Sequence, residues 1–356
     1  MNIIVFWMIF FLGCQSPSKK VQEEPADNKW LEEMTISRLQ MGYNNQEYSI
    51  ADVVSAYIDR IIELDINGPG LNSIIEINPD AMKIAQELDA ELASGTKRGP
   101  LHGVPVILKD NIATSDPMPT TAGSTALKDS YANSDSFIAR KLREAGAVII
   151  AKANLSEWAN FRAMISSSGW SGVGGQTKNP YVLDRNPCGS SSGSGVAVSA
   201  NLCMVAVGTE TNGSIVCPSN SNGIVGIKPT VGLISRSGII PISFTQDTPG
   251  PMARTVEDAA ICLGAMTGID SLDSKTLASA GKSRTDYSEY LNADGLKGKR
   301  IGLIKNSGGF HDRVDSLMVQ ATRVMKSQGA EVVEIEAPGS REYEDASYQV
   351  LLYEFK

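Results

Sequence analysis

Residues 103–111 read GVPVILKDN, an apolar run that closes on a lysine, an aspartate and an asparagine. A short run rich in Val, Ile and Leu, bounded by glycine and polar residues, is typical of a strand buried on both faces. Strands of that kind lie in sheets that helices cover from both sides. We therefore predict a buried strand over residues 104–108 that ends at Lys109.

The segments around this strand alternate between helical and extended patterns. Apolar residues recur at helical spacing after the capping-box-like Ser49 and Asp52, and Asn78-Pro79 is typical of a helix start. We expect helices over residues 50–62, 79–92, 137–144, 314–327 and from 340 onward, and strands over residues 73–77, 147–151, 300–305 and 331–335. This alternation predicts an α/β fold, a single large domain whose mixed β-sheet core is covered by helices on both faces.

The composition describes a globular chain. Of 356 residues 42% are hydrophobic, the net charge is −8 and the pI is near 5.0. The apolar content excludes disorder, and the acidic charge argues against nucleic acid as a partner, because phosphates require clustered Lys and Arg. Five scattered cysteines without a C-x-x-C pair and two histidines predict no disulfide framework and no metal site. No nucleotide-binding glycine pattern occurs, so we expect no cofactor.

The N-terminal residues are expected to lie outside the folded domain. Residues 3–12 form an apolar run that is too short to span a bilayer and typical of a signal peptide, and its end at Cys14 resembles a bacterial lipobox. We predict a signal peptide over residues 1–14 with a lipid anchor at Cys14, a flexible tether over 15–28 and the folded domain over 29–356. The protein would then be secreted or anchored in the cell envelope. A cleaved signal without lipid, or an apolar tail on a cytoplasmic protein, is the alternative.

Two glycine-containing loops stand out. Residues 166–195 hold seven glycines and eight serines, which fits a flexible linker. Trp170, Tyr181 and two Asn-Pro turns interrupt them, which favours an ordered loop system beside a site instead. Residues 208–215 read GTETNGSI; the Asn-Gly pair is a hairpin-turn signal, or its glycine lets a ligand approach backbone N–H groups that form an oxyanion hole.

Lys109 has two interpretations. A lysine at the end of an apolar strand commonly extends its ammonium group into solvent. If the side chain is buried instead, its charged form is disfavoured and it can act as a base. Half-deprotonation at pH 7 requires the pKa to fall by about 3.4 units from ~10.4, and full burial can shift a lysine by roughly 3 to 5 units.

The serine-rich loop also fits a different enzyme class. Residues 189–193 satisfy G-x-S-x-G, the nucleophile elbow of α/β-hydrolases, with Ser191 as the nucleophile. That elbow must follow a strand directly and needs a downstream histidine. A turn-like Asp-Arg-Asn-Pro precedes this loop, and His311, the downstream histidine, lies in a polar segment. Both observations argue against the elbow.

Three segments together resemble the amidase signature family. Its hallmark is a G-x-P-x-x-x-K-D strand, a glycine- and serine-rich loop and a [D/E]-T-x-G-S loop, in that order. Here these segments and further family-like stretches occur at residues 103–110, 189–194, 210–214, 223–230 and 247–252. Residues 154–160 and 210–215 look most like the bacterial peptide amidase branch. The resemblance implies the amidase signature fold and a small-molecule or peptide amide as substrate.

The resemblance also implies roles for individual residues. Lys109 would be the base, Ser190 the bridging serine that relatives hold on a cis peptide, and Ser214 the nucleophile. The oxyanion hole would consist of the backbone N–H groups of Thr211, Asn212, Gly213 and Ser214. In this Ser-Ser-Lys triad, Ser190 relays the proton of the attacking Ser214 to neutral Lys109 and later returns it to the leaving nitrogen.

The chain departs from the family pattern at several positions. Cys188 and Ser192 stand where relatives usually have glycine. Asn212 and Val216 stand where many relatives have glycine and arginine, which bears on loop geometry and substrate shape. Because no base pairs with Cys188 in the motif, we expect a packed, inert thiol there. Family members normally continue beyond Lys356, so we also expect a truncated fold with uncovered apolar faces and lowered stability or activity.

The favoured function is hydrolysis of linear carboxamides, among them C-terminal peptide amides, to an acid and ammonia or an amine. One alternative is an amidotransferase-like subunit that supplies ammonia to a partner; the signal-like N-terminus and the acidic charge oppose it. The other is a catalytically inactive envelope binding protein, which truncation favours and the intact Lys109, Ser190 and Ser214 oppose.

Overall fold

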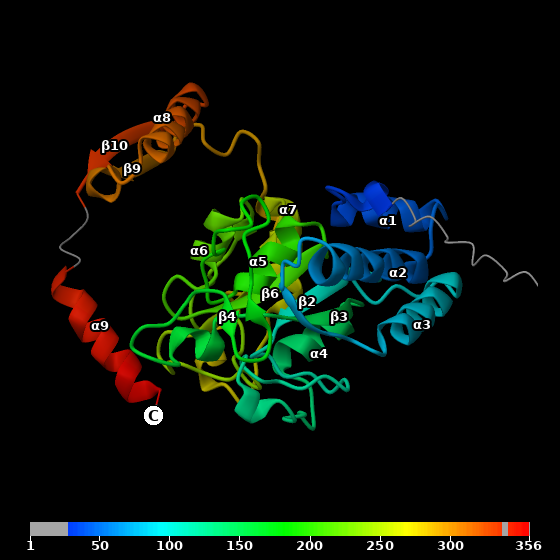
Figure 1. The fold of residues 1–356 in the computed structure, drawn as a ribbon. Coiled ribbons are helices and arrows are strands. Elements are labelled where there is room, and N and C mark those ends of the chain that lie inside the picture. The colour runs from blue at the N-terminus through cyan, green and yellow to red at the C-terminus, as the bar shows by residue number, and fades with distance from the viewer. Residues whose placement is uncertain (1–27, 337–340, 356) are drawn as a thin grey trace, which may run out of the picture.

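The computed structural model describes residues 28–336 and 341–355. The predicted signal peptide, Cys14 and the tether up to residue 27 lie outside the described residues. The helices shown in Figure 1 are α1 (Ile36–Asn44), α2 (Ile50–Arg60), α3 (Ala81–Ala93), α4 (Phe137–Glu144), α5 (Ser192–Ser199), α6 (Val216–Ser221), α7 (Val256–Met266), α8 (Asp312–Ser327) and α9 (Arg341–Glu354). The strands are β1 (Ile74–Ile77), β2 (Pro105–Lys109), β3 (Val148–Ala153), β4 (Trp170–Ser171), β5 (Gly175–Gln176), β6 (Val205–Glu210), β7 (Val225–Gly226), β8 (Thr248–Ala253), β9 (Arg300–Ile304) and β10 (Glu331–Ile335).

A mixed sheet forms the centre of the molecule. Its six strands lie in the order β1-β3-β2-β6-β8-β7. The strand predicted to end at Lys109 is β2, which lies between β3 and β6 and runs parallel to both. The outer pairs, β1 with β3 and β8 with β6 and β7, are antiparallel. The predicted mixed sheet is confirmed.

Helices cover this sheet on both faces. Every residue of β2, β3, β6 and β8 is buried. Because successive side chains of a strand point to opposite faces, continuous burial requires cover on each side. Helix α5 contacts β2 and β6, α7 contacts β8, and α2 and α4 contact β3. This arrangement is the α/β core that the sequence predicted.

The first residues of α2 and α3 test the helix-start signals that were read from the sequence. Ser49 and Asp52 form the predicted capping box at α2, with Asp52 N donating to Ser49 Oγ at 3.0 Å and Ser49 N to Asp52 Oδ2 at 2.9 Å. Helix α3 begins at Ala81, later than predicted. A turn precedes it, in which Asn78 Oδ1 accepts from Asp80 N at 3.0 Å, while Asn78 Nδ2 donates to Ile149 O of the sheet at 2.7 Å.

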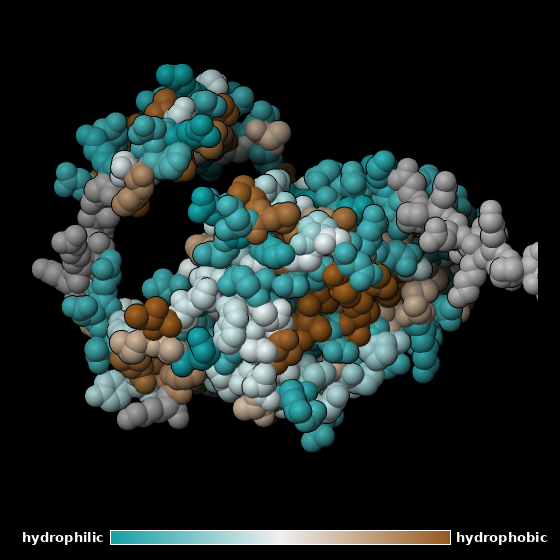
Figure 2. All heavy atoms as spheres, viewed as in Figure 1, coloured by the Kyte–Doolittle hydropathy of each residue, from teal (hydrophilic) through white to brown (hydrophobic). Residues whose placement is uncertain are grey.

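The predicted β-α-β unit near the C-terminus is present as β9, α8 and β10. Its two strands pair in parallel as a separate two-stranded sheet and do not extend the large one. Figure 1 shows the unit away from the six-stranded sheet, with α9 returning toward the main body. Figure 2 shows the same unit as spheres, separated from the main body in this view. None of the described helices combines the length and the apolar character that a bilayer-spanning segment requires.

Candidate active site

Two neighbouring parallel strands end at the same edge of the sheet. Strand β2 ends at Lys109, and β6 ends at Glu210, directly after Thr209. Ligands of open α/β sheets bind at the carboxyl ends of parallel strands. The loops that follow these two strands and the serine-rich loop before α5 build the candidate site there.

Lys109 is completely buried, which is the second of its two sequence interpretations. Its Nζ lies 2.7 Å from Ser190 Oγ and 2.9 Å from Thr209 Oγ1, and it donates to Thr209 O at 3.3 Å. Burial lowers the pKa of Lys109 to about 7, against the opposing attraction of the Asp247 and Glu210 carboxylates. An amine in this state can hold or release a proton near neutral pH.

The serine-rich loop brings Ser190 to Lys109. The Gly189–Ser190 peptide bond is cis, and Ser190 O accepts a hydrogen bond from Ser156 N at 3.0 Å. Ser190 is completely buried, and α5 begins two residues later, at Ser192. The segment is therefore an ordered loop system and not a linker.

Ser191, the nucleophile of the elbow interpretation, has a different role. Its Oγ donates to Thr209 O at 3.1 Å and accepts from Thr209 N at 3.2 Å, which ties the loop to β6. The nearest preceding strand, β5, ends at Gln176, far from the position that an elbow requires. His311 caps α8, where its Nδ1 accepts from Arg313 N at 3.2 Å.

The turn after β6 presents unpaired backbone donors. Gly213 has a φ of 90°, in the left-handed region that favours glycine. Within residues 28–336 and 341–355, no acceptor pairs with the N–H groups of Thr211, Asn212, Gly213 or Ser214. The carboxylate of Glu210 accepts the next two, from Ile215 N at 2.7 Å and Val216 N at 3.0 Å, and so holds the turn. Four consecutive free donors are the arrangement that an oxyanion hole uses.

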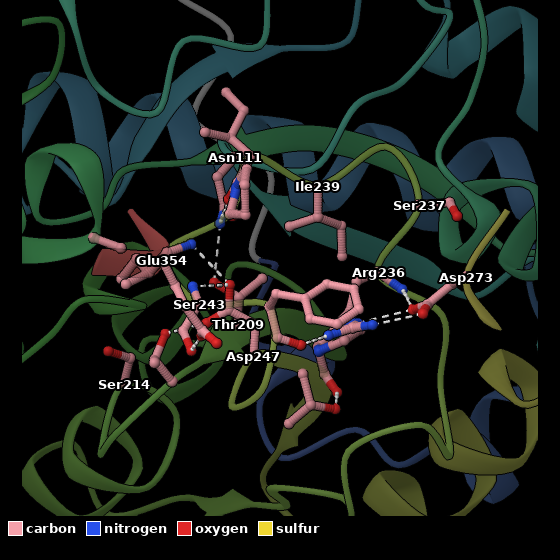
Figure 3. Close-up of a pocket in the computed structure, with 18 of the residues that line it drawn as sticks. Asn111, Thr209, Ser214, Arg236, Ser237, Ile239, Ser243, Asp247, Asp273 and Glu354 are labelled. Atoms are coloured by element: carbon pink, nitrogen blue, oxygen red, sulfur yellow. Dashed lines mark hydrogen bonds and ion pairs between the residues drawn. The ribbon is translucent and has the colours of Figure 1, made fainter. Parts of the chain in front are cut away.

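Ser190 and Ser214 line one cavity of about 290 Å³. Ser214 is 7% exposed, and its O accepts from Ser191 N at 3.1 Å, which joins the turn to the serine-rich loop. Among the described residues Ser214 Oγ makes no hydrogen bond, so the structure pairs Ser190 with Lys109 and brings Ser214 only to the same cavity. Figure 3 shows Ser214 on the side of the cavity opposite Arg236 and Asp273.

The rest of the cavity combines an apolar wall with charged groups that the sequence analysis missed. Residues 239–244 form the wall. Arg236 pairs with Asp273 through Nε at 2.8 Å and Nη2 at 2.6 Å. Asp247 accepts from Ile242 N at 2.7 Å and Ser243 N at 2.9 Å.

Glu354, from α9, also lines the cavity. It accepts from Thr245 N at 3.1 Å and from Ser243 Oγ. Asp247 lies in a stretch that the family resemblance had marked, whereas no local pattern in the sequence marks Arg236, Asp273 or Glu354.

The expectation for Cys188 is wrong. It is not a free thiol but forms a disulfide with Cys217, 29 residues later. No spacing in the sequence indicates this pairing, because the two cysteines meet only once the serine-rich loop and the start of α6 are folded together. Cys203 and Cys262 are free and buried. Within the described residues, no group of three or more His, Cys, Asp or Glu side chains could hold a metal ion.

Comparisons with known proteins agree with this geometry. Residues 52–356 match the family described as Amidase. A probable amidase from Arabidopsis thaliana is 44% identical over 330 residues, which cover 92% of this chain and 63% of that protein. A glutamyl-tRNA(Gln) amidotransferase component from Microcystis aeruginosa is 39% identical over 310 residues, 86% of this chain and 62% of the relative.

The fold is also found among solved structures. The native peptide amidase from Stenotrophomonas maltophilia has 51% sequence identity and a TM-score of 0.87, and the match covers 91% of this chain and 66% of that one. The predicted resemblance to peptide amidases is confirmed. The chain spans a little under two thirds of the length of these relatives.

Proposed function

Because this chain belongs to the amidase family, we propose that it hydrolyses linear carboxamides, among them C-terminal peptide amides, to an acid and ammonia or an amine. The single observation that carries the proposal is the contact between buried Lys109 and Ser190, 2.7 Å apart, at the edge of a cavity that Ser214 also lines. A peptide amidase as a near structural relative supports the substrate class.

In the proposed acylation step, Ser214 Oγ attacks the amide carbon and loses its proton. A serine hydroxyl is a weak nucleophile unless a base takes that proton. Ser190 Oγ accepts it and passes its own proton to the neutral amine of Lys109, whose pKa is lowered to about 7 by burial. A rotation of the Ser214 side chain toward Ser190 would complete the relay once a substrate occupies the cavity.

The backbone turn would stabilise the oxyanion. As the carbonyl carbon becomes tetrahedral, its oxygen becomes negatively charged and needs preorganised donors. The unpaired N–H groups of residues 211–214 supply them. Removing one such donor in a related type of site costs roughly 10²–10³ in turnover, so this turn would carry a large part of the rate enhancement.

The same relay would run backwards to release the leaving group. Protonated Lys109 returns a proton through Ser190 to the amide nitrogen, so that ammonia or an amine leaves instead of an anion. Water then attacks the acyl-Ser214 ester, with the relay again taking the proton. These steps use only groups of this chain, the substrate and water.

Ammonia release from a panel of peptide amides and simple amides tests the proposal. We expect turnover by the wild-type protein and loss of it in Ser214→Ala, with His311→Gln as a control that keeps its activity. Equal rates for wild type and Ser214→Ala would refute the Ser214 assignment. Loss of activity in His311→Gln would support the elbow interpretation instead.

A second candidate is an amidotransferase-like subunit, favoured by the 39% identity to the Microcystis amidotransferase component. It would release ammonia from glutamine and pass it to a partner. Comparing kcat/KM for free glutamine with that for peptide amides separates the two, because a preference for glutamine would favour the amidotransferase and a preference for peptide amides the hydrolase. A protein that binds these amides without hydrolysing any would be the inactive envelope binding protein.

We also propose a secreted or envelope-anchored location, with a lipid on Cys14. The Cys188–Cys217 disulfide supports it, because disulfides form and persist in oxidising compartments. Fractionation of cells that express the wild type and Cys14→Ser tests this: the wild type should be in the envelope fraction and the variant should leave it. A wild type found in the cytoplasm would contradict the proposal.

A further inference from the structure

We propose that Cys188 and Cys217 are positioning residues for the reaction, and that their disulfide holds together the two chain segments that carry the serine hydroxyls of the relay. The inference rests on the proposed function and adds a determinant of its rate. If the disulfide positions these segments, thiol reductants should lower the activity.

The cross-link joins the two segments that carry these hydroxyls. Cys188 precedes Ser190 by two residues, and Cys217 follows Ser214 by three. The bond brings their Cα atoms to 5.9 Å although 29 residues separate them in the chain. One end therefore lies in the loop before α5 and the other in α6, directly after the turn that ends β6.

The serine-rich loop has a backbone conformation that needs support at one end of the cross-link. Cys188 has a φ of 62°, a left-handed conformation that residues with a Cβ rarely adopt. The Cys188 backbone is held by its N–H on Asn186 Oδ1 at 3.0 Å and by its O, which accepts from Ser192 Oγ at 2.7 Å.

Ser191 Oγ ties the serine-rich loop to Thr209 of β6 through two hydrogen bonds. Two further hydrogen bonds among the described residues connect this loop to the turn after β6 and to α6. Ser191 N donates to Ser214 O at 3.1 Å. Asn222 Nδ2, at the end of α6, donates to Pro187 O at 3.0 Å. Each is a single hydrogen bond, worth about 0.5–1.5 kcal/mol net. The disulfide is the covalent connection between them, so it limits how far Ser190 and Ser214 can separate.

The disulfide lies outside the substrate cavity, so the two sulfurs hold the chain segments in place and do not take part in amide hydrolysis. Neither Cys188, which is half-buried, nor Cys217 is among the described residues that line the cavity. A soluble dithiol therefore does not have to enter the substrate cavity in order to reduce this bond. The dithiol gives two electrons and two protons, the S–S bond breaks, two cysteine thiols form and the dithiol closes to its own disulfide.

The expected effect is on turnover more than on binding. A misplacement of about 1 Å between reacting groups can cost up to roughly a hundredfold in rate. The cavity wall at residues 239–244 and the Arg236–Asp273 pair, where a substrate would make most of its contacts, lie outside the cross-linked segments. Breaking the bond should therefore lower kcat by about tenfold or more while KM changes by less than about threefold.

The test uses the full chain and a peptide amide substrate. Peptide mapping first establishes the Cys188–Cys217 cross-link, and kcat and KM are then measured before reduction with dithiothreitol, after it, and after reoxidation. The double variant Cys188→Ser/Cys217→Ser is the control: it should start at the lowered kcat and should not respond to the dithiol. Circular dichroism checks that each form is folded at the assay temperature.

Reversible loss of kcat with a stable KM in the wild type, absent in the double variant, supports the inference. Reduced protein that is folded and keeps a kcat within about twofold of the oxidised value would overturn it. So would a wild type in which the two cysteines are unlinked. Absence of any amide hydrolysis by the oxidised protein would instead count against the proposed function, so the two failures remain distinguishable.

Discussion

Lys109 experiences opposing influences on its charge. Burial disfavours its ammonium form, whereas the carboxylates of Asp247 and Glu210 favour it, and the net result is a pKa of about 7. Its nearest polar partners, the hydroxyls of Ser190 and Thr209, are neutral. The side chain is therefore able to exchange a proton with Ser190 at neutral pH.

This pKa predicts the pH dependence of the reaction. Below pH 7 Lys109 is protonated and has no lone pair to accept the relayed proton, so kcat/KM should be low. The value should rise as pH increases through about 7 and then level off. Steady-state kinetics between about pH 5.5 and 9, with a neutral substrate, measures this, and a flat profile over that range would contradict it.

Removing the amine separates catalysis from stability. Lys109→Met keeps most of the side-chain volume and should lower turnover by roughly 10²–10⁴-fold. Because burial lowers the pKa in the folded state, the unfolded wild-type chain binds the extra proton between pH 7 and about 10.4, so wild-type stability should rise with pH in that window and the variant's should not.

Lys152 is a matched control for this substitution. It is also buried with a lowered pKa of about 8, because burial disfavours its charge. Its Nζ, however, donates to Ile112 O at 2.6 Å and Thr120 Oγ1 at 3.0 Å, outside the cavity. Lys152→Met should change the unfolding free energy measured in urea with turnover largely kept. A Lys109→Met protein that loses more stability than activity would contradict the catalytic role.

At the residue scale, the sequence identified the candidate triad through motifs and missed what depends on folding. Lys109, Ser190 and Ser214 carry recognisable spacing, although their roles remain proposals. Thr209 binds Lys109 only because β2 and β6 are neighbours. The Cys188–Cys217 bond could not be inferred, because the two cysteines are 29 residues apart and no motif in the sequence pairs them.

Among the elements, the turn after β6 depends on one glycine. A Cβ added to Gly213 would meet no atom within 4 Å, but its φ of 90° is unfavourable for other residues. Gly213→Ala should therefore cost about 1 kcal/mol of stability and, because the turn would shift, lower kcat by at least about tenfold, the loss expected of one partly misplaced oxyanion donor.

Gly95, after α3, is the matched control for Gly213. It also has open space around the position of a Cβ and a φ of 82°. Gly95→Ala should show a similar loss of stability in urea unfolding with an unchanged kcat. Equal kcat for both variants would mean that the conformation of the turn does not matter for the reaction.

Elements with a polar and an apolar face were the most predictable. Helix α4 spans Phe137–Glu144, the predicted bounds, because its buried residues recur at helical spacing. Helix α5 was predicted only as part of a loop. Its residues from Ser192 to Val198 are all buried, so the helix has no solvent-facing stripe and hence no periodic signal in the sequence.

For the whole molecule, the sequence predicted the α/β class and the mixed sheet but not the strand order. Alternating helices and strands imply a covered sheet, whereas the placement of β8 between β6 and β7 depends on long-range pairing. For the same reason, the alternating pattern of β9, α8 and β10 predicted a β-α-β unit. It did not indicate whether its strands join the large sheet or form one of their own.

The central sheet and the β9-α8-β10 unit differ in burial, which predicts that they also differ in local stability. Every residue of β2, β3 and β6 is buried, whereas α8 has no buried residue and β9 alternates exposed with half-buried positions. Amide hydrogens of the β9-α8-β10 unit should exchange well before those of the central strands, because few apolar contacts oppose its opening. Hydrogen exchange with mass spectrometry measures this, and equal protection of the two regions would show that the unit is held more firmly than its burial implies.

In the proposed mechanism a buried amine, neutral near pH 7, accepts a proton from Ser214 through Ser190. Direct titration of the Lys109 side chain by NMR, with labelled lysine and Lys109→Met for assignment, tests it most directly. We expect a pKa of about 7 that coincides with the rise of kcat/KM. A pKa near the ordinary ~10.4 of a lysine, or a midpoint that differs from the kinetic one, would contradict the mechanism.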